Sequence, residues 1–300
     1  MNAGTAGLYA ITALIWGSTW IMIKFQLGVV PLQASLTYRF AIATVVLGLY
    51  AVIARRRLKI ATRDVPMVAM QGMLMFSLNY YLVYWGAEFV PSGLIAVLFT
   101  VLVLMNSIHE RLFFGTRLRP AAVLAGLLSI AGVALMFLPE VGAINLESSI
   151  VRGILLVLGS TYVASLGNMA ALVNSRRKLP VVAVNLYGMA IGTLASAAFA
   201  LLSGVSFTFD PRFEYWGSLL YLAVLGTAVA FCTYLELIER IGVSKAAYIT
   251  VLMPVIALLM STVFENYQWT GIAGAGLALA ILGNAIALAS KEAKTSPKSG

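Results

Sequence analysis

The sequence predicts an all-α integral membrane protein of ten transmembrane helices, arranged as a 5+5 inverted repeat around a central cavity. Three observations lead to this fold. Of the 300 residues, 61% are hydrophobic and only 10% are charged, whereas a soluble domain carries about 25% charged residues. The apolar residues form runs of about 20, the length a helix needs to cross roughly 30 Å of hydrocarbon. The basic residues gather in alternate loops, which is typical of membrane topology.

Ten apolar runs follow one another with only short loops between them, so no soluble domain is expected. The first run lacks the basic flank and the cleavage site of a signal peptide, and we expect it to be retained. The polar residues 291–300 are expected to form a disordered cytoplasmic tail. The predicted spans are residues 5–24, 34–54, 66–86, 91–109, 120–139, 153–173, 181–203, 215–238, 245–264 and 270–290.

The basic residues predict the orientation of the chain. Sixteen of the 20 Lys and Arg residues fall on the side that carries both termini, three fall on the opposite side, and Arg39 lies within a span. Cytoplasmic loops carry an excess of Lys and Arg. We therefore expect both termini in the cytoplasm and the chain in a bacterial inner membrane. The net charge of +9 is assigned to these loops, and no nucleic-acid partner is expected.

An internal repeat relates the two halves of the chain. Residues 91–137 align with residues 242–288 at a constant offset of 151 and without a gap, so that Gly132 stands opposite Gly283. If each repeat holds five spans, the odd number makes the two halves enter the membrane from opposite sides. The sequence therefore predicts an inverted repeat.

The repeat also divides the chain into two predicted domains. The first five-helix repeat is residues 1–145, and the second, inverted repeat is residues 146–290. Inverted repeats in transporters place the substrate site near the membrane midplane and work by rocking one part against the other. This pattern favours transport by alternating access over a structural or enzymatic role.

Several segments resemble the drug/metabolite transporter superfamily, in its EamA-type ten-helix branch, from about residue 5 to residue 290. The resemblance implies a cavity lined by both halves and the export of amino acids, including aromatic ones, or related metabolites. Other relatives carry drugs, lipid-linked metabolites or nucleotide sugars, so this second substrate class stays open. The segments that carry the resemblance are Leu14–Trp20, Tyr38–Phe40, Tyr84–Ala87, Val90–Gly93, Leu225–Ala228, Gly242–Ala247 and Met253–Val255.

Polar and aromatic side chains within the spans are candidates to line the cavity, although each could instead serve packing or interfacial anchoring. Nearly all are neutral, and such a lining suits a neutral or zwitterionic solute with an apolar part. Pro254 removes a backbone hydrogen bond in mid-span and is either a hinge or a static kink. The substrate-binding candidates are Trp16, Trp20, Arg39, Asn79, Tyr80, Tyr84, Thr100, Tyr162, Asn168, Tyr187, Tyr234 and Tyr248.

Arg39 is the one charged residue that lies inside a predicted span and more than two residues from its ends. A charge at this depth is costly, and it marks a functional site by default. The guanidinium pairs well with carboxylates and could bind a substrate carboxylate. Two structural alternatives are snorkelling to the outer headgroups and an ion pair with Glu88 or Glu265.

The chain is not expected to be an enzyme. It has one His and one Cys, and it contains no metal-ligand spacing and no nucleotide or nucleophile motif. We expect no metal and no cofactor. His109 and Glu236, near the cytoplasmic ends of their spans, are expected to be solvated, so proton coupling is not established. The expected partners are the lipid bilayer and a small organic solute such as an amino acid, and the chain is expected to be a monomer or weak dimer.

Overall fold

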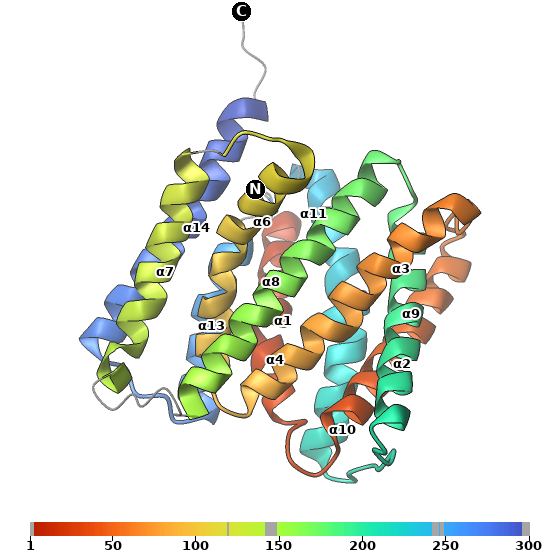
Figure 1. Ribbon diagram of the computed structural model, residues 1–300, viewed down its shortest axis with the longest axis horizontal. Coiled ribbons are helices and arrows are strands. Elements are labelled where there is room, and N and C mark those ends of the chain that lie inside the picture. Colours follow the sequence, from red (N-terminus) through yellow and green to blue (C-terminus); the bar gives the residue numbers. More distant parts are fainter. Residues whose placement is uncertain (1–2, 119, 142–148, 242–245, 247–248, 296–300) are drawn as a thin grey trace, which may run out of the picture. The chain divides into compact units, whose positions relative to one another are not determined.

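A computed structural model describes residues 3–118, 120–141, 149–241, 246 and 249–295 of the chain. All regular elements in these ranges are helices (Figure 1). Each of the ten predicted spans corresponds to one helix or to a consecutive run of helices, which confirms the all-α membrane fold. The helices gather into two compact units, which are described separately.

The first unit combines three stretches of the chain, Met1–Ile21, Phe89–Leu155 and Ala230–Gly300. Within it, α7 and α14 lie side by side along their length (Figure 1), and α5 packs on α13. Its elements are α1 (Ala3–Lys24, all but the last turn), α5 (Ser92–Leu98), the 3₁₀ turn η3 (Phe99–Val101), α6 (Leu102–Phe114), α7 (Pro120–Val141), α11 (Ala230–Ile241), α13 (Ile249–Phe264) and α14 (Gly271–Thr295).

The second unit combines Met22–Glu88 and Leu156–Val229. Within it, α9 packs on both α2 and α3, and α2 also contacts η4. Its elements are α2 (Leu32–Ile53), the 3₁₀ turn η1 (Thr62–Asp64), α3 (Val65–Met73), the π-helical η2 (Leu74–Leu78), α4 (Asn79–Ala87), most of α8 (Ser149–Arg176), α9 (Val181–Leu202), α10 (Phe213–Leu220) and the π-helical η4 (Tyr221–Val229).

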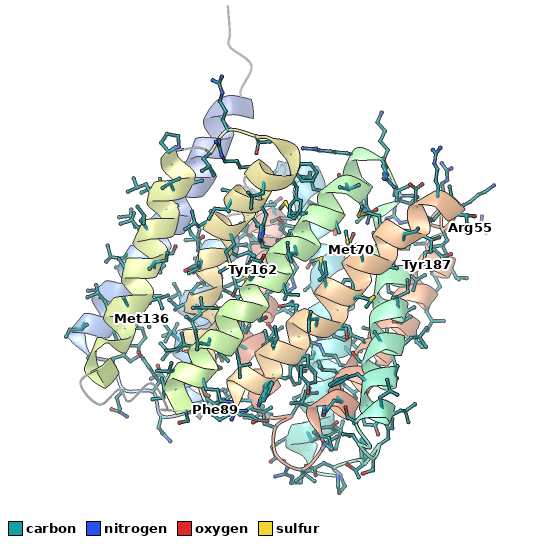
Figure 2. All side chains as sticks on the ribbon, in the orientation of Figure 1. Arg55, Met70, Phe89, Met136, Tyr162 and Tyr187 are labelled. Carbon is teal, nitrogen blue, oxygen red and sulfur yellow. The ribbon has the colours of Figure 1, made fainter. Side chains whose placement is uncertain are left out.

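The composition of the helices fits a bilayer. Five uninterrupted helical stretches among the described residues are long and apolar enough to cross it. The third and eighth spans are instead broken by η2 and η4, so neither is one continuous α-helix. Large apolar side chains point outward on many helices, for example Ile53, Leu202 and Val263, and Figure 2 shows side chains projecting all along the helices. Such surface would be unstable in water and is expected against lipid.

Three helices end later than the sequence predicted. The fourth span continues to Phe114, where Gly115 adopts a left-handed conformation with φ 65° and ends the helix, as glycine commonly does. The eighth span continues to Ile241. Helix α14 continues to Thr295, five residues beyond the predicted end of the tenth span. A formed helix gains one hydrogen bond per added residue, and Ala, Lys and Glu favour this extension.

The contact between α7 and α14 has the same register as the sequence repeat. A Cβ atom placed on Gly132 would lie 2.4 Å from the carbonyl oxygen of Gly276, and one placed on Gly283 would lie 2.5 Å from that of Ala125. Under the offset of 151, Gly132 corresponds to Gly283 and Ala125 to Gly276. The repeat therefore maps each of the two close contacts onto the other. Helices α7 and α14 pack antiparallel and are related by a local twofold axis.

Glycines also determine the approach of α3–η2 to α9. A Cβ atom on Gly72 would lie 2.4 Å from the carbonyl oxygen of Gly188, and one on Gly192 would lie 2.7 Å from Cβ of Phe76. From the first contact to the second, the residue number rises along α3–η2 and also along α9, so the two segments run parallel. This is the direction expected of the third and seventh spans in an alternating topology, and small residues are what allow helix backbones to meet closely in lipid.

The compact units do not coincide with the two predicted five-helix domains. Each unit takes helices from before and after residue 145. Partner helices of the repeat, such as α7 with α14 and α2 with α9, pack within one unit. The repeat describes how the sequence is related to itself, whereas the units describe how the folded helices gather.

Candidate functional site

The second unit holds a buried cluster around Arg39. Arg39 lies on α2 and is 3% exposed. Its Nη1 atom donates to the hydroxyl of Tyr84 at 3.2 Å, and its Cζ atom lies 4.4 Å from the ring centroid of Tyr80 and 5.3 Å from that of Phe40. The ring of Tyr80 meets that of Phe40 edge-on at 5.0 Å. The sequence prediction thus named three members of one cluster, Arg39, Tyr80 and Tyr84.

Gln26 completes this cluster, and sequence reasoning missed it. The hydroxyl of Tyr84 donates to Oε1 of Gln26 at 2.6 Å, and Gln26 is 1% exposed. The residue follows α1 in the turn that leads to α2. A single amide between Phe25 and Leu27 was the available signal, because a polar side chain in an apolar loop must find a buried partner.

The contacts of Arg39 within its own unit do not fit snorkelling or an ion pair with Glu88. Its side chain is 3% exposed and lies against the rings of Tyr80 and Phe40, which does not fit snorkelling to outer headgroups. Among the described residues of its own unit it makes no ion pair with Glu88; its partners are phenols and an aromatic face. The carboxylate of Glu265 accepts hydrogen bonds from the backbone N–H and the hydroxyl of Ser92, and from the hydroxyl of Ser261.

Tyr84 is fully buried at 0% exposure, so the alternative of an interfacial belt residue is also wrong for it. A phenol that is removed from water needs both roles of its hydroxyl satisfied. The hydroxyl of Tyr84 accepts from Arg39 and donates to Gln26. Tyr84 is therefore the residue that joins the cation to the amide.

Asn79, another predicted lining residue, is buried in the packing of α4 on α8. Its Oδ1 atom accepts a hydrogen bond of 2.5 Å from the hydroxyl of Ser160. A second buried hydrogen bond joins the same two spans, from the amide of Asn174 to the side-chain oxygen of Gln71 at 2.9 Å. These buried pairs join the third span to the sixth, and sequence reasoning did not anticipate the partners because they are 81 and 103 residues apart.

In the first unit, Trp16 and Tyr234 form an aromatic pair. Their ring centroids are 4.9 Å apart and tilted by 53°, and both pack against a cluster that includes Leu237 and Ile249. One turn before Trp16 on α1, the hydroxyl of Thr12 donates to that of Thr233 at 2.8 Å. The structure brings Trp16 and Tyr234 together from the first and eighth spans, as a common site would require.

Trp20 lies one turn further along α1 and packs on Phe99, with ring centroids 4.8 Å apart. Its indole N–H is buried and has no acceptor among the described residues, although a buried indole normally has one. Thr100, next to Phe99 in η3, uses its hydroxyl on the carbonyl of Val97 at 2.6 Å. Thr100 is buried, and its hydroxyl is already used in this local hydrogen bond to the backbone three residues earlier.

The remaining candidates are dispersed. Tyr162 on α8 and Tyr187 on α9 are 50% and 40% exposed (Figure 2), and Asn168 is half-buried on α8. Tyr248 lies outside the described residues. Pro254 is buried within α13, which runs through it without interruption, and its role as a hinge stays a prediction.

One sequence expectation about titrating groups is wrong. His109 was expected to be solvated, but it is 4% exposed and packs 5.9 Å from the ring of Phe113. Glu236 is about half exposed and pairs with Arg240 one turn later, in agreement with the expectation for that residue.

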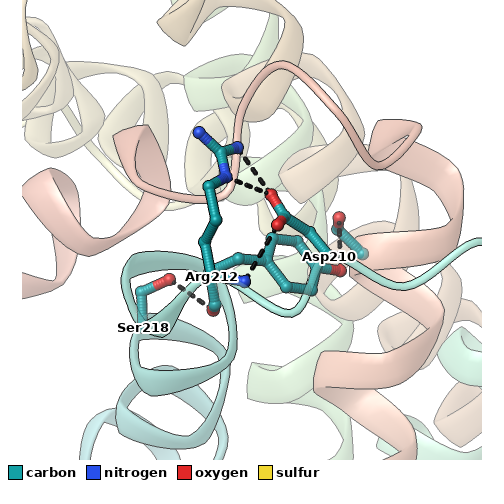
Figure 3. Close-up of polar contacts among 5 residues, drawn as sticks. Asp210, Arg212 and Ser218 are labelled. Carbon is teal, nitrogen blue, oxygen red and sulfur yellow. Dashed lines mark hydrogen bonds and ion pairs between the residues drawn. The ribbon is translucent and has the colours of Figure 1, made fainter.

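An ordered loop precedes α10 in the second unit (Figure 3). The carboxylate of Asp210 accepts from the backbone N–H of Arg212 at 3.0 Å and from its guanidinium at 2.5 and 2.8 Å. These hydrogen bonds hold the pKa of the Asp210 carboxyl below its usual range. In the first turn of α10, the hydroxyl of Tyr215 is 3.0 Å from that of Ser35 on α2.

The second unit also contains a mainly apolar cavity of about 350 Å³. Two hydrogen bonds join residues of its lining, one between the hydroxyls of Ser77 and Ser196 at 3.0 Å and one from the amide of Gln33 to the hydroxyl of Tyr81 at 3.4 Å. No predicted site residue lines it. The lining residues are Gln33, Met73, Leu74, Ser77, Leu78, Tyr81, Ala195, Ser196 and Phe199.

Comparison with known proteins gives one consistent class. The model of the EamA-like transporter family matches residues 5–138 and again residues 151–289. The chain is 26% identical over 83% of its length to an uncharacterized inner membrane transporter, YedA of Escherichia coli, of which 79% is covered. It is 24% identical over 91% of its length to a probable terminal-alkyne amino-acid exporter of Streptantibioticus cattleyicolor, of which 89% is covered.

A crystal structure of another protein has the same fold. It superposes with a TM-score of 0.68 and 19% sequence identity, covering 99% of this chain and 100% of that one. At this identity the likeness is evidence for the fold alone. The double match of the family model also falls on the two halves that the internal repeat separates.

Proposed function

The chain belongs to the EamA-like transporter family, and from this premise we propose that it exports neutral amino acids or related metabolites by alternating access. As a member of this family it is a membrane transporter and not an enzyme. In the proposal, residues 1–145 and 146–290 are the inverted repeats, and both termini lie in the cytoplasm of a bacterial cell. The name of YedA, an inner membrane transporter, supports the inner membrane as the location.

The observation that carries the proposed mechanism is the reciprocal contact between α7 and α14. Gly132 lies close to Gly276, and Gly283 lies similarly close to Ala125. The sequence repeat maps each of these pairs onto the other. A molecule built from two such halves has two conformations of similar energy, because each half can adopt the arrangement of the other. This equivalence is what allows a site to open to either side of a membrane.

The choice of amino acids as the exported class has two supports. One relative is named a probable amino-acid exporter. The chain's own candidate lining residues are all Tyr, Trp, Asn or Thr apart from Arg39, the one cation among them. Aromatic faces and hydroxyls bind the apolar part and the polar groups of a zwitterion without requiring a net charge.

Counterflow in proteoliposomes tests the proposal. The purified full-length chain is reconstituted, the vesicles are loaded with each of the twenty amino acids in turn, and uptake of the same labelled amino acid is followed. Preloading with a substrate should accelerate labelled uptake, because the loaded carrier returns faster than the empty one. Absence of acceleration for every amino acid, with vesicles shown to hold folded protein, would refute amino-acid transport.

A further inference from the structure

Arg39 is a buried cation whose partners are all neutral. A guanidinium remains protonated under all ordinary conditions. Arg39 is 3% exposed, and its contacts include the hydroxyl of Tyr84 and the rings of Tyr80 and Phe40. Contacts with aromatic faces compensate only part of the cost of removing a charge from water. Glu88, the acid of the same unit considered as its counter-ion, makes no ion pair with it among the described residues.

Hydrogen-bond donors exceed acceptors in this cluster. Arginine has five N–H groups and no acceptor, and glutamine adds two N–H groups and one carbonyl oxygen. That carbonyl oxygen in Gln26 is occupied by the hydroxyl of Tyr84, whose own oxygen is occupied by Arg39. The Nε atom of Arg39 and the Nε2 atom of Gln26 are both buried, and neither has an acceptor among the described residues.

We infer that this cluster binds the carboxylate of the exported solute, so that the substrates are amino acids and other small carboxylates but not their amides or alcohols. The inference rests on the proposed function and names its substrate class. A carboxylate supplies what the cluster lacks, since it has one negative charge and two oxygens that only accept. Guanidinium groups bind carboxylates through two parallel N–H bonds, and the spare amide N–H groups of Gln26 are further donors.

The neighbours of Arg39 suit the rest of such a solute. Tyr80 and Phe40 present aromatic rings beside the guanidinium, and Phe76 continues the aromatic surface 5.7 Å from the ring of Phe40. An acid in the cluster would neutralise Arg39 and repel an incoming carboxylate. The chain instead places an amide, Gln26, beside Tyr84, which keeps the positive charge of Arg39 available.

Efflux of paired compounds tests the inference. Proteoliposomes containing the full-length chain are loaded with neutral amino acids, each paired with its carboxamide and its amino alcohol, and efflux is measured by mass spectrometry. We expect the carboxylate member of each transported pair to leave at least tenfold faster than the two analogues. Efflux of no member of any pair would refute amino-acid export itself, whereas equal efflux of all three members would overturn only the carboxylate inference.

Substitution of the cation provides the second measurement. Arg39→Gln should reduce amino-acid efflux to that of empty vesicles, whereas Arg152→Gln should leave it unchanged. Arg152 is a matched control because its Cζ atom also lies near an aromatic ring, 5.1 Å from that of Phe89, but its side chain is exposed. Unchanged efflux and unchanged discrimination in Arg39→Gln would overturn the inference.

Gln26→Glu separates substrate binding from simple packing, and it remains informative if Arg39→Gln does not fold. The introduced carboxylate would satisfy Arg39 within the protein and compete with the solute. We expect a higher melting temperature together with efflux lowered at least tenfold. A higher melting temperature with normal efflux would mean that Arg39 serves the fold alone, and an unchanged melting temperature with normal efflux would equally contradict the inference.

Discussion

Gly132→Ala should destabilise the protein through the contact between α7 and α14. The added methyl group would lie 2.4 Å from the carbonyl oxygen of Gly276, 2.9 Å from the backbone N of Ala280 and 3.2 Å from Cβ of Ala280. The two nearest atoms belong to the backbone, so no side-chain rotation can relieve the overlap and the helices must move apart. Overpacking of this kind costs about 1–3 kcal/mol, and the backbone overlap places this substitution near the upper end of that range.

The same helix pair supplies a control and an internal check. Gly274 on α14 has no atom within 4 Å of an added Cβ, so Gly274→Ala should be neutral or slightly stabilising, because alanine favours a helix by about 1 kcal/mol over glycine. Gly283→Ala is the repeat-related counterpart of Gly132→Ala, and its methyl group would lie 2.5 Å from the carbonyl oxygen of Ala125. The two should therefore lose stability by similar amounts.

Thermal unfolding of the purified protein in detergent measures all three variants. We expect the melting temperatures of Gly132→Ala and Gly283→Ala to fall by several degrees and by similar amounts, while Gly274→Ala stays within a degree or two of the parent. If Gly132→Ala and Gly274→Ala melt together, the close helix contact is wrong. If only one of the repeat-related variants is destabilised, the local twofold relation does not hold.

Further predictions concern three other sites. Asp64→Asn should lower the unfolding free energy by about 1 kcal/mol, because it breaks a 2.8 Å pair of the buried Asp64 carboxylate with half-exposed Arg177, which directly follows α8. Urea unfolding in detergent measures this free energy, and an unchanged value would contradict the prediction. The pKa of Asp210 is lowered by its hydrogen bonds to Arg212, so its contribution to stability is complete above the pKa of an unfolded Asp, about 3.9, and is lost as the pH falls through the folded-state pKa. The melting temperature of Asp210→Asn should therefore fall less than that of the parent when the pH is lowered from 6 to 3. An equal fall in both proteins would exclude this effect. Trp16→Ala should reduce transport several-fold, while size-exclusion chromatography still shows folded protein. The control variant Trp216→Ala changes a residue that is more than a third exposed and should transport normally. Equal transport by both variants would refute a lining role for Trp16.

The order and extent of the helices could be read from the sequence because they follow from local physics. An apolar run of about 20 residues must satisfy its backbone hydrogen bonds within itself once it is in lipid. The predicted ends of the second span, at residues 34 and 54, differ by only one or two positions from those of α2, Leu32–Ile53. The later end of α14 was missed because a helix can continue into water without a hydropathy signal.

The breaks within spans could not be predicted in the same way. The π-helical segments η2 and η4 interrupt the third and eighth spans, and the hydroxyl of Thr227 reaches the carbonyl of Leu222, five residues earlier. Threonine at this position has no distinctive hydropathy. Insertions of this kind depend on how neighbouring helices pack, and they often occur at functional sites.

For the candidate site, the sequence by itself determined which side chains are unusual in a membrane: a lone Arg39, paired tryptophans on α1 and tyrosines on the third span. Their cost in lipid follows from side-chain chemistry alone and needs no fold. Only the tertiary structure decided their partners, joining Arg39 to Tyr84 and Tyr84 to Gln26, and Trp16 to Tyr234 across 218 residues of sequence. Such pairing is set by the packing of helices far apart in the chain, and hydropathy, which averages over neighbours in sequence, contains no information about it.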